Sequence, residues 1–382
     1  MSPRAIRAIG LMSGTSMDGV DAALLETDGE GLLKRGEALS TPYSREERLL
    51  LRMALEEAMS WEADRPMPEV IAEAERHLTF VHAKAVKELL EKAELRPHEV
   101  DLIGFHGQTV LHQPDRRRTV QIGLGDVLAS LTGIDVVNDF RSADVAAGGQ
   151  GAPFVPLYHR ALVRNMGISG TVAVVNIGGV GNVTYIGEDG SLIAFDTGPG
   201  NALIDDWAQR HLNEPMDRNG ELARLGEVDE SVLAQMMEHP FFLRRPPKSL
   251  DRFDFTDDAV AHLSAADGAA TLTAFTAAAM SRSLLHMPEL PRNFIICGGG
   301  RHNPVLMEEL RARIPSRVVR AEDVDWEGDH IEAEAFAYLA VRSLRGLPLS
   351  EPGTTGVPEP GNRYPGTGGR VGGSGQNTVG RS

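Results

Sequence analysis

This 382-residue chain has little cysteine, no excess of positive charge and no long hydrophobic run. The single cysteine, Cys297, excludes an intramolecular disulfide and suits a reducing compartment. The net charge of −16 leaves no basic excess for nucleic acid or an anionic membrane surface. No window approaches the roughly 20 apolar residues of a transmembrane helix, and residues 1–10 lack the apolar core of a signal peptide. These shortages predict a cytoplasmic protein with neither nucleic-acid nor membrane partners.

The remaining composition, 42% hydrophobic and 24% charged, is that of a globular protein. The length suits two domains of about 150 residues each better than one core. We place the first domain over residues 1–165, completed by a helix near residues 331–345, and the second over residues 166–330. Gly, Pro, Ser and Thr dominate the end of the chain, which predicts a disordered tail over residues 350–382.

Two strand–loop–strand patterns stand near the start of the two predicted domains. In the first, strands at residues 7–12 and 20–25 flank a polar loop; in the second, residues 172–175 and 183–186 flank a Gly-rich loop. Both read as hairpins, and their likeness predicts a duplicated α/β domain. Apolar periodicity predicts a helix over residues 71–89. Further helices are expected over residues 201–212, 269–287 (an Ala-rich run), 304–314 and 331–342, and buried apolar strands over residues 102–105, 134–137 and 294–297.

Four Gly-rich turns follow apolar strands, at residues 10–19, 176–182, 197–201 and 298–303. Glycine lets the backbone approach a phosphate and direct its N–H groups at it. For any one of these loops the alternative, that glycine only ends a strand, stays open. The chain has no P-loop, no G-x-G-x-x-G opening a helix after the first strand, and no protein-kinase signature. The residues alone therefore predict a phosphate-binding α/β protein outside those classes.

A more specific signal lies in eight blocks that follow one another along most of the chain. They read GLMSGTSMDGVD from Gly10, FHGQT from Phe105, NDFR from Asn138, GGQGAP from Gly148, NIGG from Asn176, FDTGPGN from Phe195, CGGGRHN from Cys297 and EAEAFA from Glu332. In content and order these blocks resemble the anhydro-N-acetylmuramic acid kinases. One block departs: the family usually carries a KSTGRE-like run after paired prolines, whereas KSLDRF stands here, which leaves the roles of Lys248 and Arg252 open.

The resemblance implies a two-domain α/β ATPase fold of the actin/hexokinase/Hsp70 type, with duplicated mixed-sheet domains and MgATP in an interdomain cleft. It implies a reaction in which water opens the 1,6-anhydro bond of 1,6-anhydro-N-acetylmuramic acid and O6 takes the γ-phosphoryl group of ATP. The product is N-acetylmuramic acid 6-phosphate, a step in recycling cell-wall sugar. The resemblance also suggests a homodimer.

In that fold two hairpin tips hold the phosphates, and a third Gly-rich loop lies near the adenosine. The residues expected to bind ATP are Gly10, Leu11, Met12, Ser13, Gly14, Thr15, Ser16, Met17, Asp18, Gly19, Gly178, Gly179, Gly298, Gly299, Gly300 and Asn303. Asp18 is also the carboxylate expected near Mg²⁺, because Mg²⁺ takes few protein oxygens and keeps water. The alternative is that Asp18 only shapes its turn.

The candidate general base is Asp196, which we expect to end an apolar strand and to begin a turn containing Gly198, Pro199 and Gly200. A carboxylate that takes the proton of water contributes about 10²–10⁴-fold to such a reaction. Cleavage leaves the anhydro oxygen on C6, so no separate deprotonation of a sugar hydroxyl is needed. Alternatively, Asp196 is a turn residue or caps the helix from Asn201.

The sugar carries a lactyl carboxylate and an N-acetyl group, so its site needs a cation and polar groups. Arg141 is expected to pair with the carboxylate through its guanidinium. The other residues expected to bind the sugar are His106, Gln108, Thr109, Asn138, Asp139 and Glu332. His106 has the alternative of a buried histidine satisfied within the core, and Glu334, two residues from Glu332, cannot share its helix face.

Two other functions fit parts of the pattern. A conventional kinase of a free amino sugar would use Asp196 to deprotonate the hydroxyl itself. A non-enzymatic nucleotide-driven clamp or filament would use the fold as its actin and Hsp70 relatives do. The clamp requires a substrate-binding segment after the ATPase core, where this chain has only the Gly-rich tail.

Overall fold

The computed structural model divides the chain into two compact units. The first unit contains Met1–Gly167 and His330–Ser382, and the second contains Ile168–Asp329. The last long helix therefore returns to the unit formed by the start of the chain. The residues that the structure describes are 4–14, 17–62, 65–250, 254–358 and 370–372.

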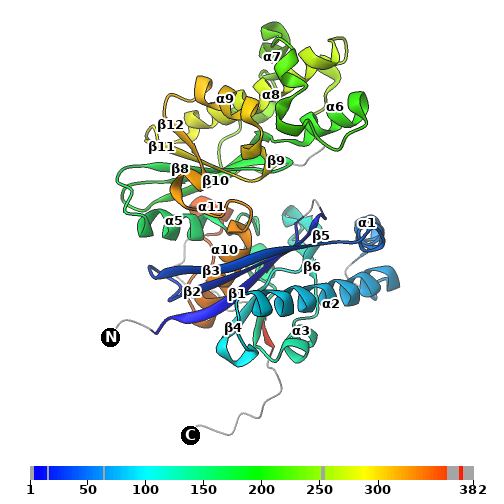
Figure 1. Cartoon of the computed structure of the whole chain (residues 1–382), viewed down its shortest axis with the longest axis vertical. Coiled ribbons are helices and arrows are strands. Elements are labelled where there is room, and N and C mark those ends of the chain that lie inside the picture. The colour runs from blue at the N-terminus through cyan, green and yellow to red at the C-terminus, as the bar shows by residue number, and fades with distance from the viewer. Residues whose placement is uncertain (1–3, 15–16, 63–64, 251–253, 359–369, 373–382) are drawn as a thin grey trace, which may run out of the picture. The chain divides into compact units, whose positions relative to one another are not determined.

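The first unit is built on a mixed sheet with the strand order β13-β7-β4-β1-β2-β3. Figure 1 labels β1, β2, β3 and β4 of this sheet. β1, β2 and β3 are joined by hairpins and pair antiparallel, whereas β4 and β7 follow helices and pair parallel to β1 and to each other. A separate hairpin pairs β5 with β6. The strands are β1 Ile6–Met12, β2 Gly19–Thr27, β3 Leu33–Pro42, β4 Leu102–Phe105, β5 Gln108–Gln113, β6 Arg118–Ile122, β7 Val136–Asn138 and β13 Arg370–Gly372.

The second unit repeats this arrangement in the order β10-β9-β8-β11-β12. Its first three strands pair antiparallel and its last two pair parallel, as in the first unit. If the strands of each sheet are numbered along the chain, and the added strand β13 is set aside, both orders read 3-2-1-4-5. The predicted duplicated α/β fold of the actin/hexokinase/Hsp70 type is thus confirmed. The strands are β8 Val172–Ile177, β9 Val180–Ile186, β10 Leu192–Pro199, β11 Asn293–Cys297 and β12 Arg317–Arg320.

The predicted helices are also present, with ends that differ by a few residues. The first unit has α1 Arg45–Ser60, α2 Glu69–Lys92, α3 Gly125–Thr132, α4 Ser142–Ala146, α5 Pro156–Asn165, α10 Ile331–Leu344 and α11 Pro352–Thr355. The second has α6 Ala202–Leu212, α7 Glu230–Met236, α8 Ala265–Arg282 and α9 Pro304–Arg313. Short 3₁₀ segments connect them, among them η5 Pro240–Leu243 and η9 Gly299–His302.

Two long helices cover opposite faces of the first sheet. Ile9 and Leu11 of β1 point to the side of α2, where they share a core with its apolar stripe. Gly10, between them, faces α10, and a Cβ there would stand 1.7 Å from the carbonyl oxygen of Ala333. Gly104 of β4 meets the same helix, with a Cβ position 2.1 Å from the carbonyl oxygen of Phe336. The two glycines let α10 pack directly on the strands that end at the candidate site.

The second unit has two apolar cores. Inward-facing residues of β8, β9, β10 and β11 pack against α8 and α9, with Phe195, Met280 and Phe294 among the buried residues. A separate core joins α6, α7 and η5 to the other side of α8, around Trp207 and Phe275. Because α8 belongs to both, it is buried over most of its length, which explains its Ala-rich sequence.

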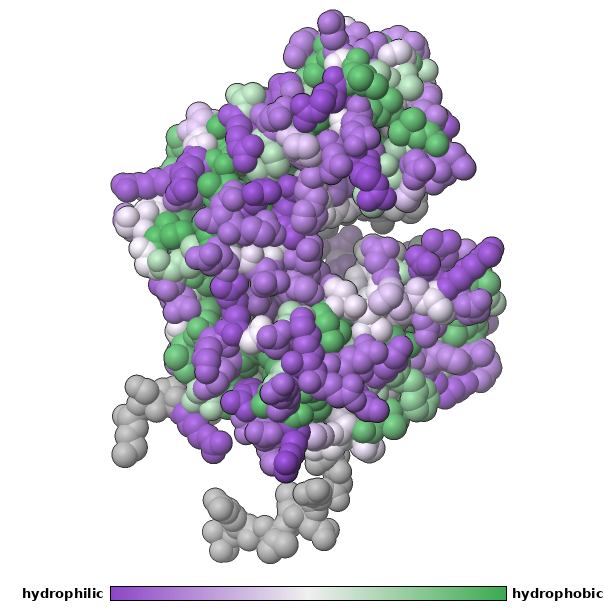
Figure 2. All heavy atoms as spheres, in the orientation of Figure 1, coloured by the Kyte–Doolittle hydropathy of each residue, from purple (hydrophilic) through white to green (hydrophobic). Residues whose placement is uncertain are grey.

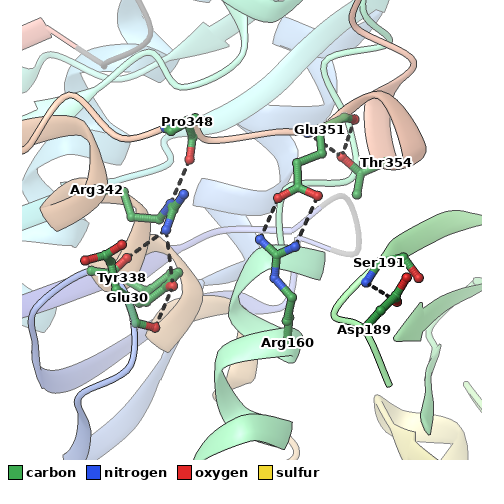
Figure 3. Close-up of polar contacts among 10 residues, drawn as sticks. Glu30, Arg160, Asp189, Ser191, Tyr338, Arg342, Pro348, Glu351 and Thr354 are labelled. Carbon is green, nitrogen blue, oxygen red and sulfur yellow. Dashed lines mark hydrogen bonds and ion pairs between the residues drawn. The ribbon is translucent and has the colours of Figure 1, made fainter. Parts of the chain in front are cut away.

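Residues 345–358 continue from α10 along the surface of the first unit, including part of the segment predicted to be a disordered tail. Arg342 donates to the carbonyl oxygen of Pro348 at 2.7 Å (Figure 3). Arg160 of α5 holds both carboxylate oxygens of Glu351, at 3.1 and 2.5 Å. Residues 350–358 are therefore part of the first unit, while residues 359–369 and 373–382 of the predicted tail lie outside the described residues.

The surface in Figure 2 is mainly hydrophilic, and hydrophobic residues appear on it in small separate patches. Within the described residues, no helix combines the length and the apolar character that crossing a bilayer requires.

Candidate functional site

The tip of the β1–β2 hairpin is supported by side chains from below. The Ser13 hydroxyl donates to Oε1 of Gln108 at 2.5 Å and lies 2.8 Å from the Tyr43 hydroxyl. The Gln108 amide Nε2 in turn donates to the carbonyl oxygen of Gly14 at 3.2 Å. Gln108 is fully buried, so the structure uses this predicted sugar ligand to hold the tip. Thr15 and Ser16, predicted to bind phosphate, lie outside the described residues.

The other predicted nucleotide residues of this hairpin divide into packing and exposed positions. Gly10 lies beneath α10, and the Leu11 side chain is fully buried in the core. Gly19 begins β2 against Thr41, and Met12 is partly buried at the end of β1.

Met17 packs on the core from a left-handed backbone conformation, φ 56°. Asp18 is exposed, and its carbonyl oxygen accepts from the N–H of Tyr43 at 3.0 Å. Of these side chains, Asp18 is the one on the surface.

A histidine–arginine pair lies beyond β4. Nδ1 of His106 lies 2.8 Å from the carbonyl oxygen of Gly107, and Nε2 accepts from Nε and Nη2 of Arg141 at 3.2 and 3.0 Å. Because a carbonyl only accepts, Nδ1 carries the hydrogen and the ring is neutral. Burial, together with the Arg141 charge, holds the pKa of His106 well below its usual range. His106 is therefore a buried histidine with both ring nitrogens hydrogen-bonded, as its alternative expects, and it orients Arg141.

Arg141 is fixed from three sides. Besides His106, its Nη1 donates to the carbonyl oxygen of Gly151 at 2.6 Å, and the guanidinium lies 5.5 Å from the centre of the Phe154 ring. Burial lowers the pKa of Arg141 to about 10, against the opposing charges of Glu332 and Asp144, so the group stays cationic at neutral pH. Its Nε edge is occupied by the histidine, which leaves the outer N–H bonds of Nη1 and Nη2 for a ligand.

The remaining predicted sugar residues of the first unit differ in their contacts. Burial raises the pKa of Glu332, and Arg141 opposes the rise. Glu334 is buried on another face of α10, where it accepts from the Tyr158 hydroxyl at 2.7 Å, in agreement with the expectation that the two glutamates diverge. Asn138 packs its amide against the start of α3, and Asp139 follows in a left-handed conformation, φ 59°. Thr109 accepts from Gln121 at 3.2 Å.

In the second unit, the turn between β8 and β9 rests on the residues that precede α6. The carbonyl oxygen of Gly178 accepts from Asn201 N–H at 2.7 Å, and that of Gly179 accepts from Gly200 N–H at 2.9 Å. In a trans peptide the following N–H points opposite to the carbonyl. The Gly179 N–H is therefore directed away from the unit at an exposed tip, as a phosphate ligand requires.

The third Gly-rich loop joins the same cluster. Gly298 has φ 73°, and a Cβ there would stand 2.3 Å from Oδ1 of Asn176. Arg301, nearly fully buried, pins this loop by donating to the carbonyl oxygen of Gly298 at 2.9 Å and to Asp329 at 2.7 Å. The predicted nucleotide ligand Asn303 uses its Oδ1 to cap α9. Within the second unit, residues 178–179, 197–201 and 298–300 thus come together.

Asp196 lies inside β10, which continues to Pro199 with an irregularity between Asp196 and Gly198. The expectation that this strand ends at residue 195 and that Asp196 begins a turn was therefore wrong. The side chain does not cap α6, whose N-cap residue is Asn201. The bulge re-aims the strand after Asp196 while keeping it paired with Asn182 of β9.

Sequence reasoning left residues 248–250 without a role, and the structure places them against Asp196. The N–H of Asp196 donates to the carbonyl oxygen of Lys248 at 3.0 Å, and the N–H of Leu250 donates to Oδ2 of Asp196 at 2.8 Å. Lys248 extends to the Phe241 ring, with Nζ 4.4 Å from its centre. The only sequence signal for this contact was the pair of prolines before Lys248, and Arg252 lies outside the described residues.

This environment shifts both charged groups toward neutrality. Burial raises the pKa of Asp196 to about 7, opposed by the Leu250 hydrogen bond and the Lys248 charge. Burial lowers the pKa of Lys248 to about 8, opposed by Asp196. A carboxyl with a pKa near neutrality is suited to accept and release protons at physiological pH.

The described residues contain no group of three or more His, Cys, Asp or Glu side chains placed to hold a metal. Mg²⁺ in phosphoryl-transfer sites takes one or two carboxylates, keeps several waters and binds the phosphates of its substrate. The exposed carboxylate of Asp18, beside the hairpin tip, fits one such donor. The chain's own residues therefore suit a Mg²⁺ ion that arrives with the nucleotide.

Comparison with known proteins decides the family. The model of the family described as anhydro-N-acetylmuramic acid kinase matches residues 6–362. The chain is 54% identical over 354 residues to the anhydro-N-acetylmuramic acid kinase of Nitrobacter winogradskyi, covering 92% of this chain and 97% of the relative. The corresponding protein of Bradyrhizobium diazoefficiens is 52% identical over 356 residues, with 93% and 97% covered. The chain belongs to the anhydro-N-acetylmuramic acid kinase family. The predicted family is thus confirmed.

Solved structures outside the family are more distant. Component A of the (R)-2-hydroxyglutaryl-CoA dehydratase of Acidaminococcus fermentans is 12% identical, with a TM-score of 0.46 over 88% of this chain and 98% of the other. A ROK family glucokinase from Streptomyces griseus, solved with glucose and AMPPNP, is 13% identical, with a TM-score of 0.37 over 87% and 98%.

Proposed function

We propose that this chain is an ATP-dependent kinase that opens the 1,6-anhydro ring of 1,6-anhydro-N-acetylmuramic acid with water and phosphorylates O6. The products are N-acetylmuramic acid 6-phosphate and ADP. Membership of a family whose relatives carry that activity in their name supports the substrate. The observation that carries the mechanism is Asp196, a carboxyl with its pKa raised to about 7 and one oxygen held by a backbone N–H.

Asp196 acts as the general base. The Leu250 N–H fixes Oδ2, so Oδ1 is the oxygen that takes the proton of the attacking water. The water oxygen bonds to C1 of the sugar as the bond between C1 and the anhydro oxygen breaks, and that oxygen stays on C6. It then attacks the γ-phosphorus, and the bond to the bridging oxygen of ADP breaks. The Lys248 charge stabilises the ionised form of Asp196, which is the form that accepts the proton.

The first unit supplies the sugar ligands in this proposal. Arg141, held by His106 and Gly151, offers its outer N–H bonds to the lactyl carboxylate. Because the arginine is already oriented, little conformational entropy is lost when the sugar binds. The other predicted residues remain proposed contacts or supports of the sugar: Gln108, Thr109, Asn138, Asp139 and Glu332.

The nucleotide is proposed to be held by backbone N–H groups at the two hairpin tips and by the Gly-rich loop after β11. Ser13, Gly14 and the outward Gly179 N–H are the proposed phosphate ligands, and residues 298–300 pass close to the adenosine. Asp18 would hold Mg²⁺, which neutralises charge on the phosphates when bound. Gly10 and Leu11 support these ligands by packing beneath them.

Two further features belong to the proposal: a cytoplasmic location and a homodimer. The single cysteine and the lack of a helix able to cross a membrane among the described residues support the first. The family resemblance supports the second. Light scattering of the purified protein measures its mass directly, and a monomer would remove the dimer from the proposal.

Mass spectrometry of the anhydro sugar incubated with the protein and MgATP tests the reaction. We expect the product to gain one water and one phosphate. In ¹⁸O-labelled water the label should appear at C1. Phosphorylation without label would leave a conventional sugar kinase, and an unchanged sugar would reject the proposal.

A further inference from the structure

Asp144 is a buried carboxylate of the first unit that the mechanism above does not use. It stands in α4, three residues after Arg141. Its Oδ1 accepts from Gly151 N–H at 2.7 Å. Its Oδ2 accepts from the Ser350 hydroxyl at 2.5 Å and from the Thr355 hydroxyl at 2.7 Å. Three donors thus converge on one carboxylate, two of them more than 200 residues away along the chain.

These contacts lead directly to the proposed sugar ligand. Gly151, held by Asp144 through its N–H, accepts from Nη1 of Arg141 through its carbonyl oxygen at 2.6 Å. Arg141 in turn donates to His106. A shift of Asp144 would therefore move the Gly151 carbonyl oxygen, which holds the far side of the guanidinium.

The segment that holds Asp144 is itself anchored on both sides. The Arg160–Glu351 pair and the Arg342–Pro348 hydrogen bond tie residues 348–351 to α5 and α10 (Figure 3). The carbonyl oxygen of Thr355 accepts from Gln150 N–H at 2.7 Å, which adds a main-chain link to the loop before Gly151. The hydroxyl of Thr355 is fully buried and so has no water to replace Asp144.

We propose that Asp144 is a positioning residue for the sugar site, and that the hydroxyls of Ser350 and Thr355 clamp it so that Gly151 and Arg141 keep their places. The proposal rests on the proposed function, because it assigns Arg141 to the sugar carboxylate. A purely structural role for the same contacts predicts that their loss lowers stability without a selective effect on the sugar.

Two neighbouring threonines provide a matched test. Thr355→Val removes a hydroxyl that bonds Asp144. Thr354→Val removes an equally buried hydroxyl whose hydrogen bonds stay within the segment, to the main chain of Glu351. We expect Thr355→Val to raise KM for the anhydro sugar about 5–10-fold, the size of one typical hydrogen bond, with KM for ATP unchanged. Thr354→Val should leave both constants near wild type.

A double mutant and hydrogen exchange complete the test. In an Arg141→Lys background, Thr355→Val should add nothing to KM, because its effect passes through Arg141. Amide exchange over residues 147–153 should rise in Thr355→Val and not in Thr354→Val, whatever the substrate. If wild type does not turn over the anhydro sugar, the proposed function fails while the exchange result still decides the clamp. Equal KM values and equal exchange in Thr355→Val and Thr354→Val would overturn the clamp proposal. If Thr355→Val does not fold, Ser350→Ala takes its place in the same comparison.

Discussion

The two units share one sheet order but treat their polar groups differently. In the first unit the polar residues near the site satisfy one another: His106 is neutral and bonded at both ring nitrogens, and Arg141 is held by it and by Gly151. In the second unit burial shifts the pKa values of Asp196 and Lys248 toward neutrality, and Oδ2 of Asp196 accepts from the main-chain N–H of Leu250.

This difference is consistent with the proposed roles, in which the first unit binds the sugar and the second supplies the general base. A ligand site gains from groups that are oriented before the ligand arrives, since fewer degrees of freedom are lost on binding. A general base needs a pKa near the working pH, which burial of a carboxylate provides. The first unit should therefore control KM for the sugar, and the second should control the chemical step.

The largest effect should come from Asp196→Asn in the second unit. The amide cannot take the proton of water, so we expect kcat to fall by about two orders of magnitude or more while the nucleotide still binds. Steady-state kinetics and calorimetry with an ATP analogue measure the two quantities. Asp189→Asn, an exposed carboxylate of the same unit, is the control and should retain activity. Near-normal turnover in Asp196→Asn would show that another residue is the base, and the proposed difference between the units would then be wrong.

Arg141→Lys in the first unit should give the next largest effect. An ammonium cannot bond His106, Gly151 and a carboxylate in the fixed directions of a guanidinium, so KM for the sugar should rise about 10-fold or more. The KM for ATP should stay unchanged. Equal losses in both constants would show that the first unit does more than bind sugar.

Lys248→Met should lower activity at pH 7 several-fold, a smaller effect. Removing the cation raises the pKa of Asp196 further above about 7, so less of the base is ionised at neutral pH. The acidic limb of the pH–rate profile should move to higher pH, and activity should recover in alkaline buffer. A profile that keeps its position would show that Lys248 acts on another group.

The smallest effect concerns stability. A carboxyl whose pKa is raised on folding contributes stability below its unfolded pKa near 4, and that contribution is lost as pH rises through the folded value of about 7. The amide of Asp196→Asn does not ionise, so the variant does not lose stability in this way as the pH rises. The melting temperature of the variant relative to wild type should therefore be higher at pH 8 than at pH 5. The opposite trend would contradict a raised pKa of Asp196 in the folded protein.

The sequence located much of the scaffold because that information is local. Hairpins at residues 7–25 and 172–186 follow from apolar strands around polar or Gly-rich loops, α2 follows from apolar periodicity, and α8 follows from an Ala-rich run. The motif blocks predicted the family correctly, and the model of that family matches residues 6–362. The candidate base was also named from its motif, although its strand was expected to end one residue before it, because a bulge leaves no pattern in the letters.

The sequence by itself determined the composition class, the order of those strands and helices that it predicted, and the family. Only the tertiary structure decided which partners the polar groups bond. Gln108 bonds the hairpin tip, residues 248–250 bond Asp196, and Thr355 bonds Asp144. The physical reason is distance along the chain. Hydrogen bonds between residues 54 to 211 positions apart depend on how elements pack, and no local periodicity or propensity records them.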